Sequence, residues 1–152
     1  MENKIKITLA KPSDTNKIVQ LEREVWKEAF GLDGVAGKYD VGSFIRLGLV
    51  FVAKDKNKIV GAIISFGTES KDMFIADWVV DKKYRNHGIG KELFNKLIKK
   101  LKNRKLITFI EERYKESIHF HKEMGFKTIK TVKDIYGIGE KQKYYVFEKI
   151  FK

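Results

Sequence analysis

The chain has 152 residues, 43% of them hydrophobic, no cysteine, and a formal net charge of +12. This length and composition are typical of one compact domain over residues 1–152, and they exclude a disordered chain, a disulfide framework and a thiolate metal site. No apolar run is long enough for a signal peptide or a membrane span, so we expect a cytoplasmic protein without a membrane partner and without bound metal. The lysines are scattered through every segment and favour a solvated surface, with a nucleic-acid-binding protein as the alternative reading of the charge.

Hydrophobic periodicity predicts one strand followed by two helices in the first third of the chain. Apolar residues alternate over residues 5–10, as they do in a half-buried strand. They recur at helical spacing over residues 18–29, and Gly31 suits the end of that helix. A second, short helix is predicted to begin after Asp40 and to end at Gly48.

The rest of the chain alternates between strand-like and helix-like patterns. In chain order we predict a strand hairpin, a third strand, a helix, a strand, a helix and two final strands, over residues 49–54, 58–66, 73–80, 89–101, 106–110, 115–124, 128–135 and 142–150. The element order is β-α-α-β-β-β-α-β-α-β-β. It predicts a mixed α/β (α+β) domain with six to seven mostly antiparallel strands and about four helices.

The strongest local signal is the segment of residues 78–91, which reads as a strand end, a glycine loop and the first turn of a helix. Unpaired N–H groups at a helix start attract a phosphate group, and the helix dipole adds to that attraction. Gly88 and Gly90 leave the backbone accessible to phosphate oxygens, while Arg85 and Lys91 add positive charge. The alternative is an ordinary strand-to-helix turn that happens to contain glycines.

Two familiar phosphate-binding motifs do not fit this segment. A dinucleotide fingerprint requires a third glycine where the chain has Leu93, and it belongs to an early β-α-β unit. A Walker loop requires Gly-Lys followed by Ser or Thr, which the chain lacks.

The segment closely resembles the acetyl-CoA motif of the GNAT acetyltransferase superfamily, R/Q-x-x-G-x-G/A, here Arg85, Gly88 and Gly90. Residues 80–84 are similar to the V-D-P-x-Y lead-in of that family, with Lys82 in place of the proline. The resemblance implies a GNAT fold and an acetyl-CoA-dependent N-acetyltransferase that acts on a primary amine of a small molecule or peptide, as a monomer or homodimer.

Residues 117–126 resemble a second conserved segment of the same family. They follow the acetyl-CoA motif by about one strand and one loop. The family pattern N-x-x-[AS]-x-x-F-Y-x-x-x-G-F is matched with two departures. Tyr114 stands at the usual asparagine position and His121 at the usual tyrosine position. Element order extends the resemblance over nearly the whole chain.

The resemblance also implies where acetyl-CoA binds. GNAT enzymes hold it where the fourth and fifth strands separate, with the fourth strand pairing to the pantetheine arm and the loop after it holding the pyrophosphate. By this analogy the backbone N–H of Val80 polarises the thioester carbonyl. The implied cofactor-binding residues are Trp78, Val79, Val80, Arg85, Asn86, His87, Gly88, Ile89, Gly90, Lys91, Tyr114 and Ser117.

His121 and Asp77 are the candidate proton donor and acceptor. Tyr114, Ser117 and His121 share a helix face by their spacing, and an imidazole titrates in the range that lets it protonate the departing thiolate; a packing histidine is the alternative. Asp77 lies within an apolar strand, which requires a substrate, a hydrogen-bond network or solvent exposure to explain it. It matches the aspartate of polyamine-type acetyltransferases, but Ala76 lacks their preceding glutamate. An ordered water is the alternative proton relay.

The acceptor site would be built from the first two helices and their connection. Its candidate residues are Trp26, Phe30, Leu32, Asp33 and Tyr39, with a place in the core as the alternative for Trp26 and Phe30. Two other functions remain open at this point, a non-catalytic acetyl-CoA-binding module and the nucleic-acid-binding protein.

Overall fold

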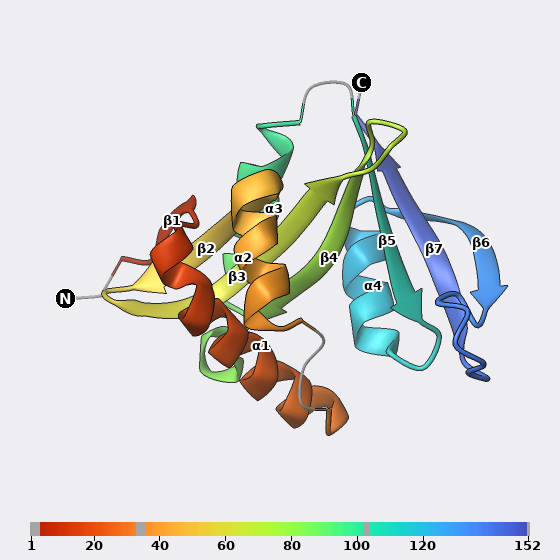
Figure 1. Cartoon of the computed structure of the whole chain (residues 1–152), viewed down its shortest axis with the longest axis horizontal. Helices are drawn as coiled ribbons and strands as arrows, with labels where there is room; N and C mark the ends of the chain where they lie inside the picture. The colour runs from red at the N-terminus through yellow and green to blue at the C-terminus, as the bar shows by residue number, and fades with distance from the viewer. Residues whose placement is uncertain (1–3, 33–35, 102–103, 152) are drawn as a thin grey trace. The chain divides into compact units, whose positions relative to one another are not determined.

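The computed structural model describes residues 4–32, 36–101 and 104–151 (Figure 1). It divides into two compact units, residues 1–67 with 75–102 and residues 68–74 with 103–152. The hydrogen-bonded strand order is β1-β2-β3-β4-β5-β7-β6. The mixed α/β fold class and the element order predicted from the sequence are confirmed, with seven strands and four α-helices in the described residues. That the whole chain works as one domain stays a prediction.

The first unit contains all three helices of the N-terminal two thirds. Its elements are β1 (Lys6–Leu9), α1 (Thr15–Phe30), α2 (Lys38–Leu47), β2 (Leu49–Asp55), β3 (Lys58–Gly67), the greater part of β4 (Met73–Val80) and α3 (Ile89–Ile98). Strands β1, β2 and β3 pair antiparallel, with a register shift between Ala53 and Lys54. Strand alternation therefore presents one apolar row to each face of this sheet.

The two faces of β2 and β3 are covered by different helices. Val52 and Ala62 lie in one buried cluster with apolar residues of α1 and α2. The next pair along the ladder, Ala53 and Gly61, points to the opposite face, where α3 approaches so closely that a Cβ at Gly61 would lie 3.1 Å from Leu93. Figure 1 shows α1 and α2 on one face of these strands and α3 on the other. Each fully buried aliphatic side chain in these layers stabilises the fold by roughly 1.5–3 kcal/mol.

The second unit is a smaller sheet with one helix. Its elements are β5 (Lys105–Glu111), α4 (Lys115–Glu123), β6 (Lys127–Lys133) and β7 (Lys143–Ile150). Strand β5 pairs antiparallel with β7 and runs parallel to the first two residues of β4, where Met73 faces Leu106. Strand β6 pairs antiparallel with β7. Phe126 and Phe147 are buried in this unit.

Predicted element boundaries differ from the observed ones by a few residues. Helix α2 begins at Lys38, ahead of the start predicted after Asp40, because the Asp40 carboxylate accepts the Gly37 N–H at 3.0 Å and caps the helix. Helix α3 ends at Ile98, although Leu101 continues its apolar spacing and is buried beyond the helix. Within the described part of the chain, no helix has the length and apolarity to cross a membrane.

Candidate functional site

The connection between β4 and α3 is tied to neighbouring strands by side-chain hydrogen bonds. Asp81 accepts hydrogen bonds from the Lys58 ammonium at 2.7 Å and the Lys83 N–H at 3.0 Å, and Tyr84 donates to Asp55 at 2.8 Å. Burial raises the pKa of Asp81, but the hydrogen bonds from Lys58 and the Lys83 N–H outweigh this effect and lower the pKa below its ordinary value. The loop therefore leaves β4 on a fixed path before it reaches the glycines.

The Arg85 side chain holds this loop in place through two hydrogen bonds. Its Nε donates to the Val80 carbonyl at 3.0 Å, and its Nη2 donates to Glu28 of α1 at 3.1 Å. Lys82 forms an ion pair with the same Glu28 carboxylate at 3.1 Å. Sequence reasoning placed Arg85 at a pyrophosphate as added charge, and the structure gives its guanidinium a second task, which is to hold the loop against α1.

The start of α3 exposes backbone donors. Gly88 caps the helix in a left-handed conformation with φ 78°, and its carbonyl accepts the Glu92 N–H at 2.9 Å. Within residues 4–32, 36–101 and 104–151, the N–H groups of Ile89, Gly90 and Lys91 have no hydrogen-bond partner. A Cβ built on Gly88 meets nothing within 4 Å, so space lies open beside these donors. An anion fits this arrangement of donors and dipole.

Trp78 connects β4 to this helix start. Its indole Nε1 donates to the Gly90 carbonyl at 3.2 Å, and its ring stacks on Phe94 with 5.1 Å between centroids. The Trp78 backbone N–H donates to the Asp77 carboxylate at 2.8 Å. The sequence predicted only backbone contacts for Trp78. In the structure its side chain also contacts the first turn of α3, whose backbone N–H groups it helps to position.

Asp77 is part of a carboxyl cluster that sequence reasoning missed. Trp26 Nε1 donates to Asp77 at 3.0 Å, which brings a predicted acceptor-site residue and the predicted base together. Glu22 of α1 is 1% exposed, and the neighbouring Asp77 raises the pKa of its carboxyl group. The missed signal was the helical spacing itself, since Glu22 lies four residues after buried Ile18 and four before Trp26.

Burial controls the protonation of both carboxyl groups. It raises the pKa of Glu22 well above its ordinary value, and the nearby Asp77 and Asp40 charges raise it further. Burial also raises the pKa of Asp77, although the neighbouring Glu22 and the hydrogen bonds from Trp26 Nε1 and the Trp78 N–H favour its charged form. These two groups are therefore unlike ordinary surface carboxylates.

His121 of the second unit is enclosed by aromatic rings. Its side chain is buried, its Nδ1 lies 2.8 Å from the Ser117 carbonyl, and its ring centroid lies 5.3 Å from that of Phe126 and 6.1 Å from that of Phe147. A carbonyl only accepts, so Nδ1 carries the proton and Nε2 carries the lone pair. Burial lowers the pKa of His121 more than the Ser117 hydrogen bond raises it, which favours the neutral imidazole.

The other residues predicted on α4 have separate partners. Tyr114 caps the N-terminus of α4, and its hydroxyl accepts a hydrogen bond from Arg113 at 3.0 Å. His119 is exposed and pairs with Glu123 at 3.3 Å. The predicted helix face of Tyr114, Ser117 and His121 is therefore joined within α4 by the His121–Ser117 contact.

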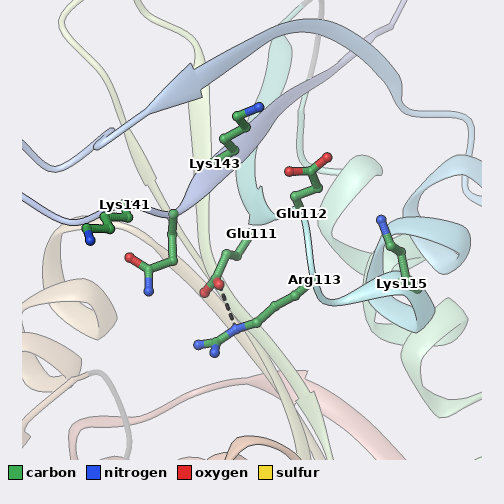
Figure 2. A pocket seen from close by; sticks show the side chains of 7 residues that line it. Glu111, Glu112, Arg113, Lys115, Lys141 and Lys143 are labelled. Atoms are coloured by element: carbon green, nitrogen blue, oxygen red, sulfur yellow. Dashed lines mark ion pairs between the residues drawn. The ribbon is translucent and has the colours of Figure 1, made fainter.

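A cavity of about 430 Å³ opens in the second unit where β5 ends and β7 begins, and sequence reasoning gave no indication of it (Figure 2). Figure 2 shows Arg113 paired with Glu111, at 2.6 Å, among several lysines. The cavity is lined by Glu111, Glu112, Arg113, Lys115, Lys141, Gln142 and Lys143. Its mixture of charges defines no single ligand class.

The predicted acceptor residues are partly exposed. The rings of Trp26 and Phe30 pack at a tilt of 56° with centroids 4.7 Å apart, and Trp26 packs against the core of the first unit. Leu32 is 45% and Tyr39 80% exposed. Asp33 lies outside the described residues.

Comparison with known proteins identifies the family. The family model described as "Acetyltransferase (GNAT) family" matches residues 17–126, more than half of the sequence. The chain therefore belongs to the GNAT acetyltransferase family. Among curated proteins, none matches the sequence significantly.

Solved structures share the fold at low sequence identity. The GNAT-family acetyltransferase of Streptococcus pneumoniae matches with a TM-score of 0.77 at 20% identity, over 98% of this chain and 100% of that chain. Arabidopsis thaliana NAA60 in complex with acetyl-CoA matches with a TM-score of 0.77 at 14% identity, over 97% and 100%. Arabidopsis thaliana Naa50 in complex with the bisubstrate analogue CoA-Ac-MVNAL matches with a TM-score of 0.73 at 22% identity, over 97% and 99%.

Proposed function

We propose that this protein is an acetyl-CoA-dependent N-acetyltransferase that transfers an acetyl group directly to a primary amine of a small molecule or peptide. The observation that carries the proposal is the start of α3, where three backbone N–H groups have no partner in the described part of the chain and lie beside the open space at Gly88. A pyrophosphate supplies the acceptor oxygens and the negative charge that such a helix start binds. Membership of the GNAT family and the acetyl-CoA complex of a structural neighbour support the same donor.

Residues of β4 and its loop would hold the donor along its length. The N–H groups of residues 89–91 face the pyrophosphate, and Lys91 adds charge at the same helix turn. Arg85 keeps the loop in place through Val80 and Glu28, and its charge would add to the attraction for the pyrophosphate. The Val80 N–H would donate to the thioester oxygen as that oxygen gains charge during attack.

The transfer itself needs a neutral amine and a route for two protons. Asp77 takes one proton from the acceptor ammonium, and the neutral nitrogen attacks the thioester carbon as the C–N bond forms. The C–S bond then breaks and the thiolate leaves with the bonding electrons. His121 takes up a proton from solvent at Nε2 and passes that proton to the thiolate, and the second nitrogen proton returns to solvent.

A peptide amine is one acceptor class that the neighbours support. The Naa50 complex contains a peptide-derived bisubstrate analogue, and that protein shares the fold of this chain. Exposed apolar side chains at Leu32 and Tyr39 offer a surface for an acceptor chain beside α1 and α2. A small amine is also included in the proposal. Proton transfer to Asp77 involves only the ammonium group, so it does not depend on the rest of the molecule that carries the amine.

Calorimetry with two ligands tests the donor site directly. Acetyl-CoA should bind the wild-type protein at least 100-fold more tightly than acetyl-pantetheine, which carries the thioester arm without pyrophosphate. Equal affinity for the two would show that the α3 donors do not hold the pyrophosphate. An amine panel with radiolabelled acetyl-CoA then identifies the acceptor.

A second candidate function, a non-catalytic acetyl-CoA-binding module, is favoured by the enclosure of His121. A neutral imidazole whose Nδ1 bonds Ser117 is a poor proton donor until it is first protonated. Tight acetyl-CoA binding without acetyl transfer to any amine would select this candidate. Transfer to a single amine above the uncatalysed rate would remove it.

A further inference from the structure

Glu22 is the most anomalous polar group in the first unit. Its side chain is 1% exposed, and within the described residues neither of its carboxylate oxygens has a hydrogen-bond donor in reach. An ionised carboxylate buried in this way costs several kcal/mol. The group therefore requires a proton of its own or a partner that the protein itself does not supply.

Among the described residues no cation forms an ion pair with this acid, although the sequence contains 32 Lys and Arg residues. The charged groups that act on Glu22 are both acidic, Asp77 of β4 and Asp40 of α2. Across residues 4–32, 36–101 and 104–151, neither Glu22 nor Asp77 forms an ion pair.

Asp14, in the same unit, shows how the protein treats a buried acid with a structural role. Asp14 is 6% exposed. It accepts a hydrogen bond from the Lys11 N–H at 2.9 Å and forms an ion pair with Lys54 at 2.9 Å. Burial raises the pKa of Asp14, but these contacts outweigh it and lower the pKa. Within the described residues Glu22 has neither a hydrogen-bond donor nor a cation, and Asp77 has hydrogen-bond donors but no cation, so this pair differs in kind from Asp14.

The hydrogen-bond pattern assigns the proton within the pair. Two carboxylates are both acceptors, so a hydrogen bond between Glu22 and Asp77 exists only when one of them is protonated. Asp77 already accepts from Trp26 Nε1 and from the Trp78 N–H, at 3.0 Å and 2.8 Å. Both donors favour charge on Asp77, which places the proton on Glu22.

We propose that Glu22 and Asp77 form a carboxyl pair with one shared proton, and that Glu22 is the positioning residue that holds Asp77 charged to receive the proton of the acceptor ammonium. This inference rests on the proposed function and deepens it. When Asp77 accepts that proton, the pair goes from one negative charge to none and the nitrogen becomes a neutral nucleophile. The proton then passes to solvent, and the pair regains its charge.

Asp77 lies on β4 next to a residue of the proposed acetyl-CoA site. Asp77 immediately precedes Trp78, whose indole positions the donors of α3. Trp26 of α1 donates to Asp77, and the Asp40 charge of α2 also acts on Glu22. A cationic amine is the chemical class that an uncompensated carboxyl pair attracts.

Carboxyl titration by carbon-13 NMR tests the shared proton without any activity measurement. In the wild type, the Asp77 Cγ and Glu22 Cδ signals should each move in two steps at the same two pH values, because each group senses both protons. In Glu22→Gln, which keeps the shape of the side chain, Asp77 should titrate in one step. A single, identical step for Asp77 in both proteins would overturn the pair.

The pH profile of kcat/KM tests the role of the pair. Its acid limb should coincide with the lower step of the pair in the wild type and with the single Asp77 step in Glu22→Gln. Asp77→Asn should lower kcat/KM by about 10²-fold or more and abolish that limb, with the Kd of acetyl-CoA within about twofold of the wild type. Asp14→Asn, the matched loss of a buried acid, should leave the limb in place.

The failure of this inference and that of the proposed function give different results. Absent acetyl-CoA binding would overturn the proposed function, while the NMR titration would still decide whether the proton is shared. A kcat/KM limb that follows neither carboxyl step would leave the acetyltransferase intact and remove Glu22 and Asp77 from its proton transfer.

Discussion

The start of α3 and the middle of α4 carry the two family motifs of this chain, and they are built in opposite ways. At α3 the functional groups are backbone donors beside an open space, set by the left-handed Gly88 at φ 78°. At α4 the candidate group is a side chain, His121, enclosed by Phe126 and Phe147. A backbone site works wherever the chain turns correctly, whereas burial changes the chemistry of an ionisable side chain.

The largest expected effect is that of a substitution at Gly88, in the open site at the start of α3. Gly88→Glu should weaken acetyl-CoA binding by at least 100-fold, since the side chain enters the space beside the helix donors and repels the pyrophosphate. The left-handed backbone adds strain of roughly 1–2 kcal/mol. Calorimetry measures the change in Kd.

The control for this change is Gly137→Glu in the second unit. Gly137 has φ 66° and open space around its Cβ, so the substitution adds the same charge and similar backbone strain. It should leave the Kd of acetyl-CoA within about twofold. Equal losses in both variants would assign the effect to strain and remove the phosphate role of Gly88.

The enclosed side is tested by His121→Phe. Phenylalanine keeps the aromatic packing and removes both ring nitrogens, so kcat should fall by about 10²-fold if His121 protonates the thiolate. The Kd of acetyl-CoA should change by no more than twofold. Stopped-flow or steady-state assays with the best amine measure the effect.

The matched variant is His119→Phe, on the exposed side of the same helix. It should leave kcat unchanged. If His121→Phe behaves like His119→Phe, then His121 is a packing residue, and the enclosure of its ring has removed the role that the motif position has in the family.

Burial of an ionisable group also predicts how stability depends on pH. The folded-state pKa of Glu22 is raised above the ordinary value of 4.5, so its contribution to stability is present below that value and is lost as the pH rises through the raised pKa. Glu22→Gln should therefore be more stable than the wild type at neutral and alkaline pH, by about 1–3 kcal/mol. Urea unfolding from pH 4 to pH 9 measures the difference.

Asp14→Asn should show the opposite pH dependence. The folded-state pKa of Asp14 is lowered, so its contribution is present at neutral pH and is lost as the pH falls through that pKa. The variant should be less stable than the wild type at pH 7, with the difference shrinking in acid. Parallel pH curves for the two variants would contradict the assignment of opposite charge states to Glu22 and Asp14.

The smallest expected effect concerns the Trp78 side chain at the open site. Trp78→Phe keeps an aromatic ring against Phe94 and removes the hydrogen bond to the Gly90 carbonyl. The free energy of unfolding should fall by about 0.5–1.5 kcal/mol, and the Kd of acetyl-CoA should rise a few-fold. An unchanged Kd together with lower stability would show that the indole supports the fold alone.

The local parts of this protein follow from its sequence. Strand β4 was predicted over the residues it occupies, and α4 to within one residue, because the pattern of apolar side chains repeats within a few positions. The Gly88 turn was predicted for the same reason, since dihedral preferences and helix-end donors depend on neighbouring residues.

Only the tertiary structure decided what surrounds the functional side chains. Glu22 and Asp77 belong to α1 and β4, and nothing near either residue in the sequence shows that they meet without a cation. Arg85 was predicted as added positive charge, but its partner Glu28 comes from another helix. The protonation of His121 depends on Phe126 and Phe147, which pack around it from outside its helix. Backbone shape is a local property, whereas the charge state of a buried group is a property of everything packed against it.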